Sequence, residues 1–171
     1  MLRIIEPSPL TADQVRALTR ILQTVVAEGA SVGYLTPPSE DVATAYWRAL
    51  PRSGVRLFLA EVAGAVVGTV QLHDAESANG THRAEVCKLL VSPEHRRQGI
   101  ASALLAHVES AARTDGKLLL HLDTRAGDPS NLLYRSTGWT EAGAIPAWAR
   151  STDGTLEMTV FWFRDLGQTE D

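Results

Sequence analysis

A short polar segment, residues 96–102 with the sequence RRQGIAS, lies between an apolar run that ends at Val91 and a long amphipathic stretch. Apolar residues recur at helical spacing after it, so the segment is expected to form the start of a helix. The first N–H groups of a helix have no intrahelical partner, and the helix dipole adds partial positive charge. Gly99 lets the backbone approach a ligand, and Arg96 and Arg97 add guanidinium groups. The segment therefore predicts a site for phosphate oxygens.

Two other phosphate-binding patterns, GxxxxGK[ST] and GxGxxG, are absent from the chain. A helix start that merely carries two solvated arginines is the alternative interpretation of this segment. Its position between a predicted strand and a predicted helix favours phosphate binding.

Two carboxylates, Glu85 and Asp123, stand in otherwise apolar runs that predict strands. A carboxylate in such a run costs free energy unless it is paired or functional, so each is a candidate general base. For Glu85 the alternative is an ion pair with Arg83 or Lys88. For Asp123 the alternative is a turn or cap at the end of its strand.

Tyr134 follows Asn131 by three residues, which places both on one face of a short predicted helix. Its hydroxyl can donate a proton to a departing anion, so Tyr134 is a candidate general acid, with an ordinary half-buried tyrosine as the alternative. His121 shares a strand face with Asp123 and is interpreted as a core histidine. Cys87 is expected to be a small buried thiol rather than a nucleophile. The histidines have no metal-ligand spacing, so no metal site is predicted.

The hydrophobic pattern also defines the elements that must position these residues. Strands are predicted at residues 2–5, 57–62, 66–72, 84–91, 118–122 and 156–163. Helices are predicted at residues 11–29, 39–50, 98–113 and 129–136, the first with a capping box of Thr11 and Gln14. This order predicts an α/β chain with a mixed sheet and helices on both faces, in one domain over residues 1–171.

Composition excludes several classes of protein. The net charge of -4 gives no support for a nucleic-acid partner. No apolar run approaches the ~18 residues of a membrane helix, and the N-terminus has no secretory signal pattern. Cys87 is the only cysteine, so an intramolecular disulfide is impossible, which fits a reducing compartment. We expect a soluble cytoplasmic protein that binds neither nucleic acid nor membranes.

Arg96, Gly99 and Ala101 match the pattern Arg/Gln-x-x-Gly-x-Gly/Ala, through which the chain resembles the GCN5-related N-acetyltransferases (GNAT). Residues 90–93 (LVSP) and 104–105 (LL) also fit that family. The resemblance implies the acyl-CoA N-acyltransferase fold, whose twisted central sheet is mixed and mostly antiparallel. It further implies acetyl-CoA as the co-substrate, no metal, and direct transfer of the acetyl group without an acetyl-enzyme.

The same resemblance implies the roles of individual residues. Glu85, Asp123 and Tyr134 match the catalytic groups. The strand that ends at Val91 is implied to diverge from its neighbour and to offer free backbone to the pantetheine arm. The positions implied to bind the cofactor are Leu89, Leu90, Val91, Arg96, Arg97, Gln98, Gly99, Ile100, Ala101, Ser102 and Asn131.

Further short blocks, among them residues 29–33, 83–86, 88–89 and 119–124, resemble in order the tabtoxin resistance branch of that family, which inactivates a β-lactam amino-acid toxin. This implies an acceptor amine or hydroxyl on a small molecule, such as a toxin or antibiotic similar to tabtoxinine-β-lactam. Arg125 and a loop over residues 146–153 depart from that branch, so the acceptor can differ. The alternatives are a protein N-terminus or lysine as acceptor, and a non-catalytic acyl-CoA sensor. Monomer and homodimer both stay open.

Overall fold

A single mixed sheet forms the centre of the computed structural model, which describes residues 1–167. Within this range seven strands lie in the order β1-β2-β3-β4-β5-β7-β6. Neighbouring strands are antiparallel except for the parallel pair β4 and β5. The strands are β1 (Leu2–Ile5), β2 (Val55–Val62), β3 (Ala65–Asp74), β4 (Arg83–Val91), β5 (Leu119–Arg125), β6 (Thr140–Arg150) and β7 (Leu156–Asp165).

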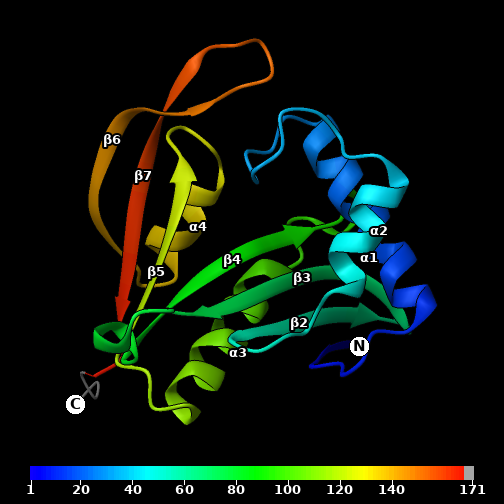
Figure 1. Ribbon diagram of the computed structural model, residues 1–171, viewed down its shortest axis with the longest axis horizontal. Helices are drawn as coiled ribbons and strands as arrows, with labels where there is room; N and C mark the ends of the chain where they lie inside the picture. Colours follow the sequence, from blue (N-terminus) through cyan, green and yellow to red (C-terminus); the bar gives the residue numbers. More distant parts are fainter. Residues whose placement is uncertain (168–171) are drawn as a thin grey trace.

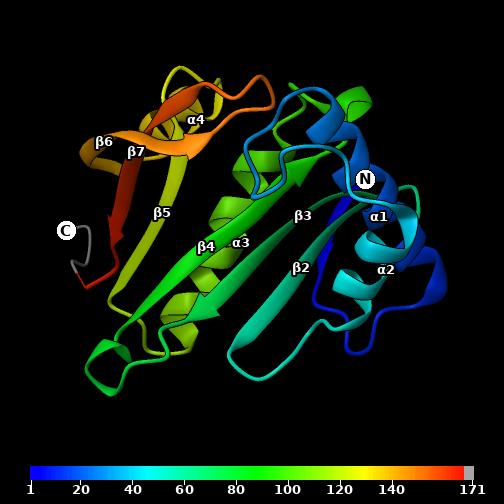
Figure 2. The same ribbon diagram turned by 45° about the horizontal axis from the view of Figure 1, so that its top comes forward.

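Helices cover both faces of the sheet, as Figures 1 and 2 show. The helices α1 (Ala12–Ala27) and α2 (Glu40–Arg48) lie on one face, and α3 (Ile100–Thr114) and α4 (Ser130–Ser136) lie on the other. Each pair closes its own apolar cluster against the sheet. The predicted mixed sheet with helices on both faces is thus confirmed. In the described residues, no helix combines the length and apolar character needed to cross a membrane.

Local sequence explains where the first elements begin and turn. Helix α1 starts at Thr11, whose hydroxyl accepts from the Gln14 N–H at 3.2 Å, while the Gln14 side chain accepts from the Thr11 N–H at 2.9 Å. The predicted capping box is therefore present. The β2–β3 hairpin turns at Ala63 and Gly64, both of which have positive φ, at 51° and 82°. Such a turn matches the twist of its strands.

Strand β6 was not predicted, because residues 146–153 were expected to form a loop. Nearly every residue of β6 is exposed, since it is an edge strand that pairs only with β7. Its register with β7 shifts twice, between Glu141 and Gly143 and between Ile145 and Ala149. Pro146 is tolerated because it stands at one of these irregularities on an edge strand. An exposed strand interrupted in this way has no apolar alternation for a sequence pattern to detect.

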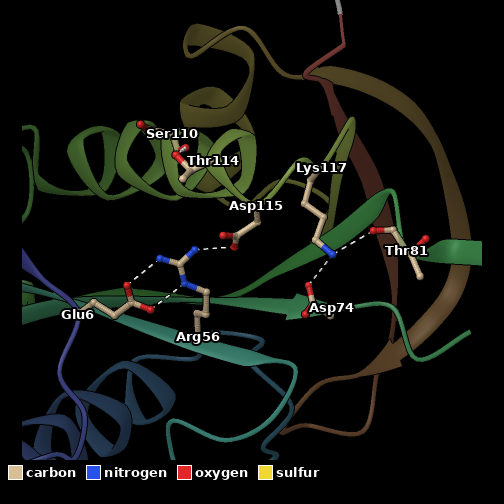
Figure 3. A network of polar contacts seen from close by, with 8 residues as sticks. All are labelled: Glu6, Arg56, Asp74, Thr81, Ser110, Thr114, Asp115 and Lys117. Carbon is tan, nitrogen blue, oxygen red and sulfur yellow. Dashed lines mark hydrogen bonds and ion pairs between the residues drawn. The ribbon is translucent and has the colours of Figure 1, made fainter. Parts of the chain in front are cut away.

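A polar network fastens the C-terminal end of α3 to the sheet (Figure 3). Arg56 of β2 donates to both oxygens of Glu6 at 2.7 Å and pairs with Asp115 at 2.5 Å. Lys117 pairs with Asp74 at 2.8 Å and donates to the carbonyl oxygen of Thr81 at 3.0 Å. Arg56 thus joins three segments that are far apart in the sequence.

Removing Arg56 should weaken the fold in a pH-dependent way. Its hydrogen bonds hold the pKa of Glu6 below the usual value. A lowered carboxyl pKa contributes stability above the pKa of the unfolded state, and this contribution is lost as pH falls through the folded pKa. We expect Arg56→Met to lower the free energy of unfolding by about 1 kcal/mol at pH 7 in urea titrations, and by less near pH 3.

The matched control is Arg16→Met, which removes an exposed pair with Asp13 on α1. It should change the free energy of unfolding by less than about 0.5 kcal/mol. Equal losses in both variants, or a loss for Arg56→Met that does not depend on pH, would contradict this account of the network.

Candidate functional site

Strands β4 and β5 separate after a short paired stretch. Their register consists of Arg83 with Leu119, Ala84 with Leu120, and Glu85 with His121. From residue 86 onward β4 has no partner strand on its β5 side within the described residues, and Figure 1 shows the two strands diverging. Backbone N–H and C=O groups on that side are left to bind something else.

A bulge in β4 lies beside this gap. The register with β3 passes from Gln71–Cys87 to Thr69–Leu90, so β4 has one residue more than β3 between these pairs. Lys88 lies in the bulge with a φ of 50°, a left-handed conformation that non-glycine residues rarely adopt. The bulge redirects the side chains that follow it.

A cleft of about 1280 Å³ opens where the two strands diverge. One wall consists of the end of β4 and the start of α3, and another consists of the end of β5 and α4. Residues 30–35, which follow α1, and residues 148–150 of β6 complete the lining. The cleft thus extends from the beginning of a helix to a sheet face that carries titratable residues.

The start of α3 forms one end of the cleft. Gly99 is the N-cap with a φ of 78°, and no side chain caps the first turn. Arg97, two residues earlier, also has a positive φ of 61°. A backbone turned in this way presents successive N–H groups to an anion, and the helix dipole adds to their attraction. Helix α3 begins two residues later than the predicted residue 98.

The predicted cofactor residues differ in their relation to the cleft. Nine of them line it: Leu89, Leu90, Val91, Arg96, Arg97, Gly99, Ile100, Ala101 and Ser102. Gln98 and Asn131 are not among the lining residues. The Asn131 amide instead donates to the carbonyl oxygens of Arg125 and Asp128, at 2.8 and 3.0 Å. A cofactor contact of any of these eleven residues stays a prediction.

Both candidate bases, Glu85 and Asp123, line the cleft. No ion pair joins Glu85 to Arg83 or Lys88 in the part of the chain that the structure describes. Asp123 lies within β5, opposite Phe161, and not at a turn. Burial raises the pKa of Asp123, and the negative charge of Glu85 raises it further. A carboxylate with a raised pKa is a better proton acceptor.

The candidate acid, Tyr134, also lines the cleft and is only 7% exposed. Its ring lies between Trp139 and Trp162, with centroids 6.0 and 6.1 Å away. The Trp139 indole donates to Glu109 at 2.9 Å, and the Trp162 indole donates to Asn131 at 3.3 Å. Burial raises the pKa of the Tyr134 hydroxyl, so it keeps its proton at neutral pH.

A row of polar side chains, which was not predicted from the sequence, crosses the sheet beside Glu85. His73 of β3 and His121 of β5 are the register partners of Glu85. The Nε2 atom of His73 lies 2.8 Å from Oε1 of the buried Gln71, whose amide also bonds the Tyr46 hydroxyl of α2. Burial lowers the pKa of both histidines, which favours their neutral forms. The period-two spacing of Gln71 and His73 in an apolar strand was the available signal.

Comparison with known proteins identifies the family. Residues 20–139 match the model of the acetyltransferase (GNAT) family, and the chain belongs to this family. An uncharacterised N-acetyltransferase from the hisH-hisA intergenic region of Azospirillum brasilense is 31% identical over 103 residues. That match covers 58% of this chain and 61% of the relative, so it spans about three fifths of the relative's length.

Solved structures show the same fold. A GNAT superfamily phosphinothricin acetyltransferase from Sinorhizobium meliloti, in complex with acetyl-CoA, has a TM-score of 0.83 at 24% identity, over 99% of this chain and 90% of that chain. A ribosomal-protein-alanine N-acetyltransferase from Brucella melitensis has a TM-score of 0.80 at 22% identity, over 95% of this chain and 99% of that chain. The predicted GNAT fold is therefore confirmed.

The Cys87 thiol should be unreactive in the folded protein. Burial raises its pKa to about 12, and the charge of Glu85 contributes to the rise. Since the thiolate is the reactive form, a disulfide reagent at about pH 8 should modify the native protein far more slowly than a free thiol. Denaturant should then release one equivalent per chain, because Cys87 is the only cysteine.

Cys87→Ser is the companion variant and should leave no reactive thiol in native or unfolded protein. Modification of native Cys87 at the rate of a free thiol would contradict the raised pKa. Modification faster than a free thiol would support a nucleophile, because it would require a lowered pKa.

Proposed function

We propose that this protein transfers an acetyl group from acetyl-CoA directly to the amine of a small molecule. The observation that carries this proposal is the single cleft that connects the uncapped start of α3 with Glu85, Asp123 and Tyr134. One end suits a phosphorylated acyl donor, and the other end holds groups that accept and donate protons.

The donor end fits acetyl-CoA, with which the S. meliloti acetyltransferase was solved. Its pyrophosphate would bind the N–H groups of residues 97–102, with Arg97 adding positive charge. The pantetheine arm would lie in the gap between β4 and β5 and bond the free backbone of residues 89–91. No contact of this end requires a metal ion.

The acceptor end suits attack by an amine. Glu85 or Asp123 takes a proton from the incoming ammonium, which leaves a neutral amine nucleophile. The amine nitrogen bonds to the acetyl carbon, the bond from that carbon to sulfur breaks, and the electron pair stays on sulfur. Tyr134 then donates its proton to the thiolate of CoA, and the second proton that the nitrogen loses returns to the Tyr134 oxygen through solvent. With a hydroxyl acceptor, the base would take the hydroxyl proton during attack, and Tyr134 would again protonate the thiolate.

The walls of the cleft favour a small acceptor over a protein chain. Residues 30–35 and 148–150 both line it, so an acceptor must fit between a loop and a strand. A toxin or antibiotic of the tabtoxinine-β-lactam kind is one such molecule. Acetylation of a protein N-terminus or lysine is the alternative, and the B. melitensis protein is named as an N-acetyltransferase of a ribosomal-protein alanine. Both reactions are compatible with the cytoplasm, where we place the protein.

Substitution of Gly99 tests the donor end. We expect Gly99→Glu to weaken acetyl-CoA binding at least about a hundredfold in calorimetry, because a carboxylate at the helix start repels the pyrophosphate. Gly116→Glu is the matched control, since Gly116 follows the other end of α3 with a similar φ of 73°. At both positions an added Cβ would have no heavy atom within 4 Å, so the two substitutions meet the same steric conditions. Equal affinities of the two variants would overturn the phosphate site.

Substitution of Tyr134 tests the chemistry. We expect Tyr134→Phe to lower kcat about a hundredfold while the Kd of acetyl-CoA stays within about twofold, because only the proton donor is lost. The loss should persist between about pH 6 and 9, since the raised pKa keeps the hydroxyl protonated there. Turnover is measured by thiol release with a panel of amines. Unchanged kcat across that range would exclude Tyr134 as the acid.

A further inference from the structure

Five basic side chains of Lys or Arg line the cleft, and three of them are held by the protein itself. Arg96 pairs with Glu28 at 2.7 Å. The Arg125 guanidinium pairs with Asp128 at 2.8 Å and donates to a backbone carbonyl at 3.0 Å. Arg150 donates to another backbone carbonyl at 2.9 Å. These three therefore have part of their bonding capacity occupied.

The other two, Lys88 and Arg97, have no hydrogen bond or ion pair within residues 1–167. Arg97 lies beside the uncapped start of α3, where the phosphates of the donor are expected. Lys88 lies in the bulge of β4, three residues after Glu85. The two free cations thus belong to different ends of the cleft.

Several observations place the Lys88 ammonium at the acceptor end. Its nitrogen lies 3.8 Å from the position that a Cβ on Gly33 would take, so the side chain reaches the loop after α1. Burial and Glu85 raise the pKa of Asp123, and the charge of Lys88 opposes that rise. The ammonium therefore lies close enough to Asp123 to act on it without forming an ion pair.

We propose that the Lys88 ammonium binds an anionic group of the acceptor, so that the preferred substrates are amines that carry a carboxylate or a similar oxyanion. This rests on the proposed acetyl transfer at the same site. Glu85, Lys88 and Asp123 all line the same cleft, so one small molecule can place its amine near Glu85 and Asp123 and its anion near Lys88.

The arrangement of charges explains why both groups of the acceptor matter. A half-buried ammonium without a counterion gains from a bound oxyanion through charge-assisted hydrogen bonds. The acceptor's own ammonium is attracted at the same time by Glu85 and Asp123. A neutral amide in place of the acid would leave Lys88 without a counterion in the occupied cleft, which disfavours binding. The cleft therefore selects acceptors by two charges, an ammonium near Glu85 and Asp123 and an anion near Lys88.

The test compares matched acceptors. L-amino acids and short ω-amino acids are each paired with their carboxamides, and thiol release from acetyl-CoA gives kcat/KM for both members. The wild-type protein should prefer the acids by at least about tenfold. Lys88→Met should remove this preference, and Lys88→Arg should keep part of it. Arg20→Met, which removes an exposed cation of α1 outside the cleft, should change the ratio by less than about twofold.

Each outcome decides between defined possibilities. Equal turnover of acids and amides by the wild type overturns the role of Lys88 but leaves the acetyltransferase function intact. A preference for acids that persists in Lys88→Met also overturns the role of Lys88. A change in acetyl-CoA affinity alone overturns it too, because Lys88 would then bind the donor and not the acceptor. No turnover of any amine while acetyl-CoA binds contradicts the proposed function itself. If Lys88→Met does not fold, Lys88→Gln replaces it, and a preference for acids that persists in Lys88→Gln overturns the role of Lys88.

Discussion

The separation of β4 from β5 after three residue pairs is the constraint on which the rest of the site depends. Parallel strands normally satisfy each other's backbone groups, and here β4 gives up this pairing from residue 86 onward. The loss is tolerated because β3 still pairs with the other side of β4 up to Val91. Among the described residues, the backbone groups on the β5 side of β4 therefore have no strand partner from residue 86 to Val91, in the segment that precedes α3. A long acyl donor can bond to these groups as a missing strand would.

This gap also determines the electrostatics of the cleft. Asp123 of β5 lies deep enough for burial to raise its pKa, and burial lowers the pKa of His73 and His121. The positive backbone groups of the α3 start lie at the opposite end. Because Glu85, Asp123 and the helix start line one cavity, a ligand that binds the helix start is directed toward the two carboxylates. Proximity of this kind supplies much of the barrier reduction in a two-substrate reaction.

The sequence predicted those parts of the site that depend on local pattern. The start of α3, the carboxylates in apolar runs and the spacing of Asn131 and Tyr134 are all visible in short windows. The partnership of Glu85 with His73 and His121 was not predictable, because it follows from register across three strands. The free Lys88 was not predictable either, since a bulge depends on the partner strand.

The position of the helix start depends on contacts at some distance from it. Near its beginning, α3 packs so closely on β3 that a Cβ at Gly68 would lie 3.3 Å from Leu104 and 3.5 Å from Ile100. At its other end, Arg56 bonds Asp115 and thereby ties the helix to β2. A rigid helix held at both ends transmits any displacement along its axis. Hence the polar network in Figure 3, although it lies outside the cleft, helps to hold the N–H groups at the start of α3 in position beside the cleft.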